Sequence, residues 1–196
     1  MYTIDKQYTA SQIIKKSEFI CNIFPIKNLE DAQNILQNIR KQHHDATHNC
    51  YAMIYGESGE YARSSDDGEP SQTAGVVILD VLQKNELTNV LAVVTRYFGG
   101  IKLGAGGLVR AYSSSTSGAV KIAKIIPIIK TTHINIKFDY TYTNEILKLF
   151  KNYKEIESKY ETKVSITYEI PISDKDFLQE KIISLTKNQT TITFFD

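Results

Sequence analysis

The sequence has only two cysteines, almost no net charge and no long apolar run. Two cysteines, Cys21 and Cys50, are too few for a disulfide framework and fit reduced thiols in a cytoplasm. Lys and Arg number 23 against 22 Asp and Glu. The chain is therefore no general binder of polyanions, and any nucleic-acid contact must come from a local patch. No segment approaches the roughly 18 consecutive apolar residues of a membrane-spanning helix, and the first residues lack the apolar core of a signal peptide. We therefore expect a cytoplasmic protein with no membrane partner.

The most distinctive stretch, residues 89–112, reads NVLAVVTRYFGGIKLGAGGLVRAY. It begins with an apolar, β-branched run over residues 90–94, which is typical of a strand buried on both faces. Five of the ten glycines then fall within residues 99–107, and we expect a helix to begin at Leu108. Glycine permits positive φ and close backbone approach, so residues 99–107 form a glycine-rich loop with exposed N–H groups. Such a loop at a helix N-terminus favours an anion.

Basic and aromatic residues accompany these glycines, and residues 89–112 contain no acidic side chain. Amides and cations without a nearby acid favour phosphate, and adjacent aromatic rings favour stacking of nucleic-acid bases. The alternative is structural: the glycines let the helix pack closely on the sheet, and the cations are solvated. The spacing is neither a Walker loop nor a dinucleotide-binding fingerprint. The candidate binding residues of this stretch are Arg96, Tyr97, Phe98, Gly99, Gly100, Lys102, Gly104, Gly106, Gly107 and Arg110.

The second chemically dense stretch is an acidic turn, residues 66–69, which precedes Pro70. Asp-Gly is a turn signal. Three carboxylates in four residues suit Mg²⁺ bound together with substrate phosphates, or basic residues on a partner; the alternative is a solvated turn. We expect the acidic turn and the glycine-rich loop to form one binding surface. The candidate residues of the turn are Asp66, Asp67, Gly68 and Glu69.

A cluster of histidines and one cysteine, residues 43–50, invites a metal site. His48 and Cys50 would share one face of a strand. The spacing matches no common zinc pattern, and no second pair of ligands follows downstream. We therefore predict no metal and no cofactor. Catalytic residues cannot be assigned from spacing, and the sequence favours a binding protein over an enzyme.

Hydrophobic periodicity predicts an α+β first domain over residues 1–126. Asn28 is the expected N-cap of one helix, with acidic residues in the first turn. Ser71 or Thr73 is the expected cap of a second helix. Pro127 ends this region, since proline cannot continue a helix. The expected elements are two strands within residues 8–24, a helix over 29–42, a strand over 48–55, and helices over 74–83 and 108–123.

The second predicted domain, residues 131–196, has the cleanest alternation in the chain. Its elements follow the order β-α-β-β-α-β of a ferredoxin-like sandwich. Thr143 and Ser173 are the expected caps of its two helices. No catalytic set is apparent among its polar residues, so we interpret it as a recognition or scaffolding module. The expected strands begin near residues 134, 156, 164 and 190.

Two stretches together resemble the signature of the IMPACT/YigZ family. They are DDGEPSQTAG over residues 66–75 and RYFGGIKLGAGGLVRAY over residues 96–112. The alternating residues from His44 to Cys50, and the opening Lys16-Ser-x-Phe-Ile, match the family as well. The resemblance covers about residues 1–126, and the length matches the two-domain, bacterial YigZ branch.

The resemblance implies that the first domain shares the fold of elongation factor G domain IV and a ribosomal small-subunit protein. The second domain would be similar to the last domain of elongation factor G. Eukaryotic members regulate translation by interfering with activation of a stress kinase. The resemblance thus implies a translation-linked regulatory protein that binds RNA, the ribosome or a ribosome-associated protein, without DNA sequence specificity.

Two alternatives of other classes remain open at this stage, as does the oligomeric state. One is a phosphate-handling enzyme, because the GHMP small-molecule kinases share the implied fold; the glycine-rich loop would bind phosphates and the acidic turn Mg²⁺. The other is a regulator that contacts only proteins. Fold does not imply function, so the site must decide between them.

Overall fold

A computed structural model describes residues 1–56 and 58–195. The chain divides into two compact units, of which the first is Met1–Ile128 and the second begins at Ile129. Both units combine helices with antiparallel sheets, so the predicted α+β class is confirmed. No helix within the described residues has the length and apolar character needed to cross a membrane.

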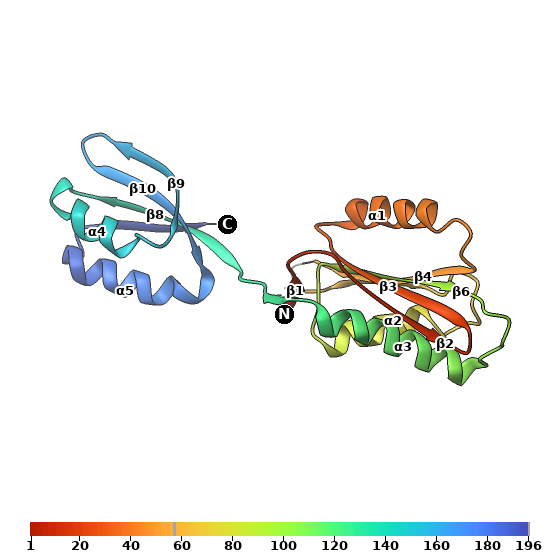
Figure 1. The fold of residues 1–196 in the computed structure, drawn as a ribbon. Coiled ribbons are helices and arrows are strands. Elements are labelled where there is room, and N and C mark those ends of the chain that lie inside the picture. Colours follow the sequence, from red (N-terminus) through yellow and green to blue (C-terminus); the bar gives the residue numbers. More distant parts are fainter. Residues whose placement is uncertain (57, 196) are drawn as a thin grey trace. The chain divides into compact units, whose positions relative to one another are not determined.

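The first unit is built on a five-stranded antiparallel sheet with strand order β2-β3-β6-β4-β5. One helix, α1, covers one face, and α2 and α3 cover the other (Figure 1). A two-stranded ribbon joins β1 to β7. The elements are β1 (Tyr2–Ile4), β2 (Tyr8–Ile14), β3 (Ser17–Pro25), α1 (Leu29–Gln42), β4 (His48–Tyr55), β5 (Tyr61–Ser65), α2 (Gly75–Lys84), β6 (Val90–Tyr97), α3 (Ala105–Ile122) and β7 (Ile125–Pro127).

Strand β6 lies at the centre of this sheet and is buried on both faces, as its apolar run predicts. Val90, Ala92 and Val94 join the core under α2 and α3. Leu91 and Val93 join the smaller core under α1. Because side chains alternate along a strand, one apolar run stabilises both layers.

The start of α3 differs from the expectation. The helix begins at Ala105, not at Leu108, and therefore contains Gly106 and Gly107. Gly104 adopts φ 71° and turns the chain into the helix, and its carbonyl accepts a hydrogen bond from the Leu108 amide. Only residues 99–104 of the glycine-rich loop are thus loop in the structure; the rest form the first turn of α3.

The predicted cap of α2 was also wrong. Neither Ser71 nor Thr73 caps the helix, and the Thr73 hydroxyl donates to the Pro70 carbonyl instead. The amides of Ala74 and Gly75 donate to Oδ1 of Asp66, at 2.9 and 2.8 Å. A carboxylate of the acidic turn, eight residues before Ala74, therefore satisfies the N-terminal amides that a side chain at the cap position would otherwise satisfy.

The second unit has a four-stranded antiparallel sheet with strand order β11-β8-β10-β9. Its elements follow the order β-α-β-β-α-β along the chain, so the unit has the ferredoxin-like arrangement. The caps expected here were wrong: Thr143 Oγ1 donates back to the Tyr140 carbonyl, and Ser173 lies within a 3₁₀ turn before the helix. The elements are β8 (Thr131–Phe138), η1 (Tyr140–Tyr142), α4 (Thr143–Leu149), β9 (Lys154–Tyr160), β10 (Val164–Pro171), η2 (Ile172–Asp174), α5 (Lys175–Thr186) and β11 (Thr191–Phe195).

Candidate functional site

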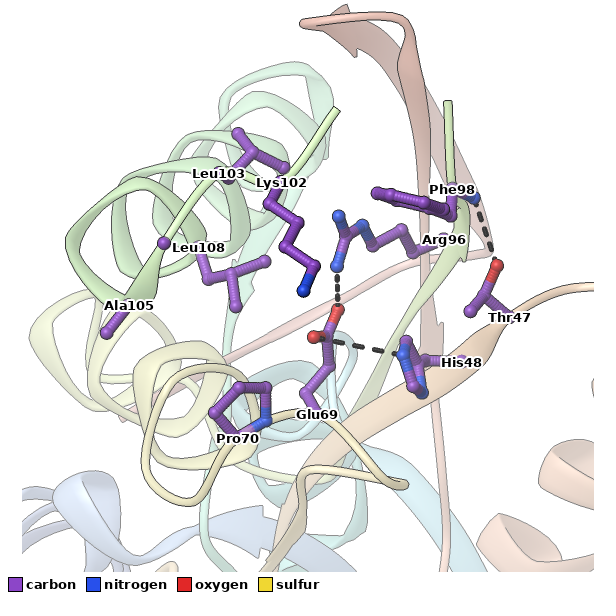
Figure 2. Close-up of a pocket in the computed structure, with 11 residues that line it drawn as sticks. Thr47, His48, Glu69, Pro70, Arg96, Phe98, Lys102, Leu103, Ala105 and Leu108 are labelled. Carbon is purple, nitrogen blue, oxygen red and sulfur yellow. Dashed lines mark hydrogen bonds and ion pairs between the residues drawn. The ribbon is translucent and has the colours of Figure 1, made fainter. Parts of the chain in front are cut away.

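A pocket of about 420 Å³ lies in the first unit, where the end of β6, the start of β4, the acidic turn and the first turn of α3 meet (Figure 2). It brings Glu69 of the acidic turn together with Arg96, Phe98 and the glycine-rich loop. Lys102 points into it from the loop. The lining residues are Thr47, His48, Glu69, Pro70, Arg96, Phe98, Lys102, Leu103, Gly104, Ala105 and Leu108.

A buried ion pair forms the floor of this pocket. Arg96 Nη1 lies 2.6 Å from Glu69 Oε1, and the two residues are only 5% and 8% exposed. The Tyr112 hydroxyl donates to the same oxygen at 2.8 Å. The guanidinium also lies against the rings of Phe19 and Phe98, at 5.4 and 5.5 Å. The carboxylate therefore compensates a charge that would be costly to bury alone.

This ion pair corrects the expectation for Arg96. The absence of acidic residues within residues 89–112 suggested an unpaired cation beside the loop. Glu69, 27 residues earlier, supplies the missing carboxylate. Arg96 is therefore a structural residue at the floor of the pocket, and it is unavailable as a surface ligand for phosphate.

The other two carboxylates of the acidic turn also have partners within the chain. Asp66 accepts from the amides of Gln72, Ala74 and Gly75. Burial raises the pKa of Asp66, but these backbone hydrogen bonds outweigh it and hold the pKa below the ordinary 3.8. Asp67 Oδ1 lies 3.0 Å from Arg40, and Oδ2 accepts from a backbone amide of β4. The carboxylates that a magnesium-dependent enzyme would use are thus held by internal donors.

Gly68, the remaining residue of the turn, adopts φ 89° and lies against the ring of His48. His48 Nδ1 is 2.8 Å from the Asp67 carbonyl oxygen. The described residues include no group of three or more His, Cys, Asp or Glu side chains placed to hold a metal ion.

Neither cysteine is placed as a nucleophile. Burial raises the pKa of Cys50 to about 12, and it does the same for Cys21. Both thiols are therefore protonated at neutral pH, whereas the thiolate is the reactive form. Cys50 instead contacts the Asp66 carbonyl at 2.9 Å and the Tyr112 hydroxyl at 3.3 Å, within the network behind the pocket.

The glycine-rich loop packs directly on the turn between β2 and β3. The Gly99 amide donates to Ser17 Oγ, and a Cβ on Gly99 would lie 2.0 Å from the backbone of Lys16. Only glycine permits this approach. It brings two exposed lysines, Lys15 and Lys16, beside the loop, which the sequence did not identify as site residues.

Four exposed cations therefore surround the loop. Lys15 and Arg110 line one groove, whose lining includes no acidic residue among those that the structure describes, and Lys102 belongs to the neighbouring pocket. Tyr97 points away from them: its hydroxyl lies 2.9 Å from His43 Nδ1 and donates to Asp45 at 3.3 Å. We call the set Lys15, Lys16, Lys102 and Arg110 the basic surface.

The fold and the site define a two-unit α+β protein with a partly apolar pocket beside a glycine-rich helix N-terminus. Residues 15–120 match the family model described as Impact N-terminal domain. The IMPACT family member YvyE of Bacillus subtilis is 36% identical over 193 residues, covering 97% of this chain and 89% of that protein. YigZ of Escherichia coli is 39% identical over 115 residues, covering 58% of this chain and 56% of that protein.

A crystal structure titled as that of a hypothetical protein has a TM-score of 0.68 and 29% identity, covering 97% of this chain and 95% of that one. The chain belongs to the IMPACT family, as its two motifs indicated. At the level of the family, this membership supports a regulatory protein connected with translation.

Proposed function

We propose that this protein is a translation-linked regulator that binds single-stranded RNA, free or in the ribosome, through the basic surface. The observation that carries the proposal is the start of α3. Gly104 provides no side-chain cap, and the first amides of an α-helix have no intrahelical acceptor. These amides and the helix dipole favour an anion at the rim of the pocket.

The basic surface supports a polyanion in preference to a single phosphate. Its four cations come from three segments: the β2–β3 turn, the glycine-rich loop and the second turn of α3. A flexible backbone with regularly spaced phosphates can contact cations distributed in this way. Because the net charge of the chain is only +1, we expect local binding of moderate strength.

Phe98 supports single-stranded RNA over a duplex. Phe98 is 46% exposed at the pocket rim, and its ring lies against the Arg96 guanidinium. An exposed aromatic ring beside phosphate-binding groups stacks unpaired bases, which a duplex does not offer. Tyr97 has its hydroxyl engaged elsewhere, so we assign base stacking to Phe98 alone.

Replacing Arg110 by alanine tests this function. If RNA neutralises about three cations of the surface, the logarithm of the association constant should fall with the logarithm of salt concentration at a slope near −2. Arg110→Ala should weaken binding to all sequences alike and reduce that slope by about 0.7, since phosphate contacts carry no base information. The measurement is a salt titration of fluorescently labelled RNA.

Lys121→Ala is the matched control, because Lys121 is an exposed cation in the last turn of the same helix. It should leave the slope unchanged. A wild-type protein that binds neither RNA nor purified ribosomal particles at low salt would contradict the proposal. Binding to particles that persists after Arg110→Ala and after nuclease treatment would indicate a protein partner instead.

A further inference from the structure

The interior of the pocket has features that a phosphate-binding surface does not require. Phe98, Leu103, Leu108 and Pro70 provide apolar walls, and the pocket leads inward to the charged floor. Its volume, about 420 Å³, lies within the range of small-molecule sites. An apolar pocket with a few convergent polar groups suits a flat, partly polar ligand that inserts edge first.

Two acceptors face each other at the floor. Because the Asp67 carbonyl can only accept, His48 Nδ1 carries the hydrogen of their 2.8 Å contact, and the neutral tautomer with that hydrogen has Nε2 as an acceptor. Nε2 lies 3.8 Å from Glu69 Oε2, too far for a hydrogen bond. The Arg96 and Tyr112 contacts are made through the other oxygen, Oε1. Oε2 therefore presents an acceptor to the pocket, joined by Nε2 in the neutral tautomer, and a ligand group with N–H donors complements them.

The mouth of the pocket has the opposite preference. Lys102 points into the pocket, and the uncapped N-terminus of α3 contributes Gly104 and Ala105 to its lining. Both favour an anion. At the floor, by contrast, the buried Arg96 Nε has no hydrogen-bond partner within the described residues, so one donor lies there beside the acceptors. The complementary ligand is therefore anionic at one end, flat and apolar in the middle, and rich in N–H donors at the other end.

We propose that the pocket binds one unstacked nucleotide whose base carries an amino group. The base inserts between Phe98 and the leucines, and its amino group donates to Glu69 Oε2 and His48 Nε2. The phosphate lies at the start of α3 with Lys102. The inference rests on the proposed function in that RNA supplies the nucleotide as an unpaired residue; a free mononucleotide is the other source with the same chemistry.

A pair of probes differing in one group tests this on the wild-type protein. Adenosine 5′-monophosphate should bind about tenfold more tightly than purine riboside 5′-monophosphate, which lacks only the amino group, because the acceptor pair loses its donor. Inorganic phosphate should compete only weakly with either. Isothermal titration at constant salt measures all three. Equal affinities for the two nucleotides, or no nucleotide binding at millimolar concentration, would overturn the proposal.

A variant pair provides the second arm. Phe98→Ala should weaken the binding of adenosine 5′-monophosphate by roughly 5- to 150-fold, which corresponds to the loss of one aromatic–base stack. Ile101→Ala is the matched control: Ile101 is 40% exposed in the same loop, does not line the pocket, and should leave the affinity unchanged. Equal losses in the two variants would contradict the assigned base position.

The two proposals fail separately. Arg110 lines the neighbouring groove, so Arg110→Ala should change the RNA salt slope and leave unchanged the ratio of the affinities for the two nucleotides, which is set at the floor of the pocket. RNA binding together with equal affinity for the two nucleotides removes the pocket assignment alone. Nucleotide discrimination without RNA binding supports the pocket as a site for free nucleotides and removes the proposed function.

Discussion

Replacing Glu69 by alanine should lower the free energy of unfolding of the first unit by roughly 3–5 kcal/mol, which is the effect of stranding a buried charge. Arg96 is 5% exposed, and its guanidinium would lose the carboxylate 2.6 Å away. The buried Tyr112 hydroxyl would lose its acceptor in the same change. Urea denaturation followed by circular dichroism measures the effect.

Three further variants separate the stranded charge from a simple loss of packing. Asp80→Ala removes an exposed helical ion pair with Lys84 and should cost less than about 0.5 kcal/mol. Glu69→Leu combined with Arg96→Met removes both charges and should be more stable than Glu69→Leu alone. A Glu69→Ala protein within about 1 kcal/mol of wild type would contradict the structural role of the ion pair.

Replacing Gly99 by alanine should be the most damaging change in the glycine-rich loop. The added Cβ would lie 2.0 Å from the carbonyl group of Lys16, and backbone atoms cannot move aside as a flexible side chain can. The β2–β3 turn must shift, at a cost of about 1–3 kcal/mol or more. The same shift displaces Lys15 and Lys16, so RNA affinity should fall with stability. Thermal unfolding and RNA titration measure the two effects.

Gly106→Ala is the matched control for this prediction. Gly106 lies inside α3, and the atom closest to an added Cβ is Arg110 Nη1 at 3.7 Å, an ordinary contact. Because alanine is the better helix former, this variant should be unchanged or more stable by up to about 1 kcal/mol. If Gly99→Ala and Gly106→Ala unfold alike, the close approach of the loop to the β2–β3 turn does not constrain the fold.

Sequence patterns predicted those elements that are determined by residues close together in the sequence. The run Val90–Val94 indicated a strand buried on both faces, and β6 is that strand. Asn28 was the expected cap of α1, and its side chain accepts the Asp31 amide at 2.9 Å. In both cases the residues that determine the structure are adjacent in sequence, so periodicity and capping rules are sufficient.

Contacts between distant residues produced the features that the sequence did not reveal. Asp66 caps α2 from outside the helix, which made the local candidates Ser71 and Thr73 wrong. Glu69 neutralises Arg96, which lies 27 residues later in the sequence, and no motif or residue spacing in the sequence predicts that ion pair. The short ribbon pairs β1 with β7, the first and last strands of the first unit in sequence, and the sequence analysis did not predict it. Such contacts depend on the assembled sheet.

The most direct test of the RNA-binding surface is a titration of ¹⁵N-labelled protein with single-stranded RNA, followed by amide chemical shifts. The amides of Ala105, Gly106 and Gly107, at the uncapped start of α3, should shift first and to the largest extent. The Phe98 amide should follow, and that of Lys121 at the other end of the helix should remain in place. Shifts confined to residues outside 14–18 and 96–114, or none at low salt, would contradict RNA binding at this surface.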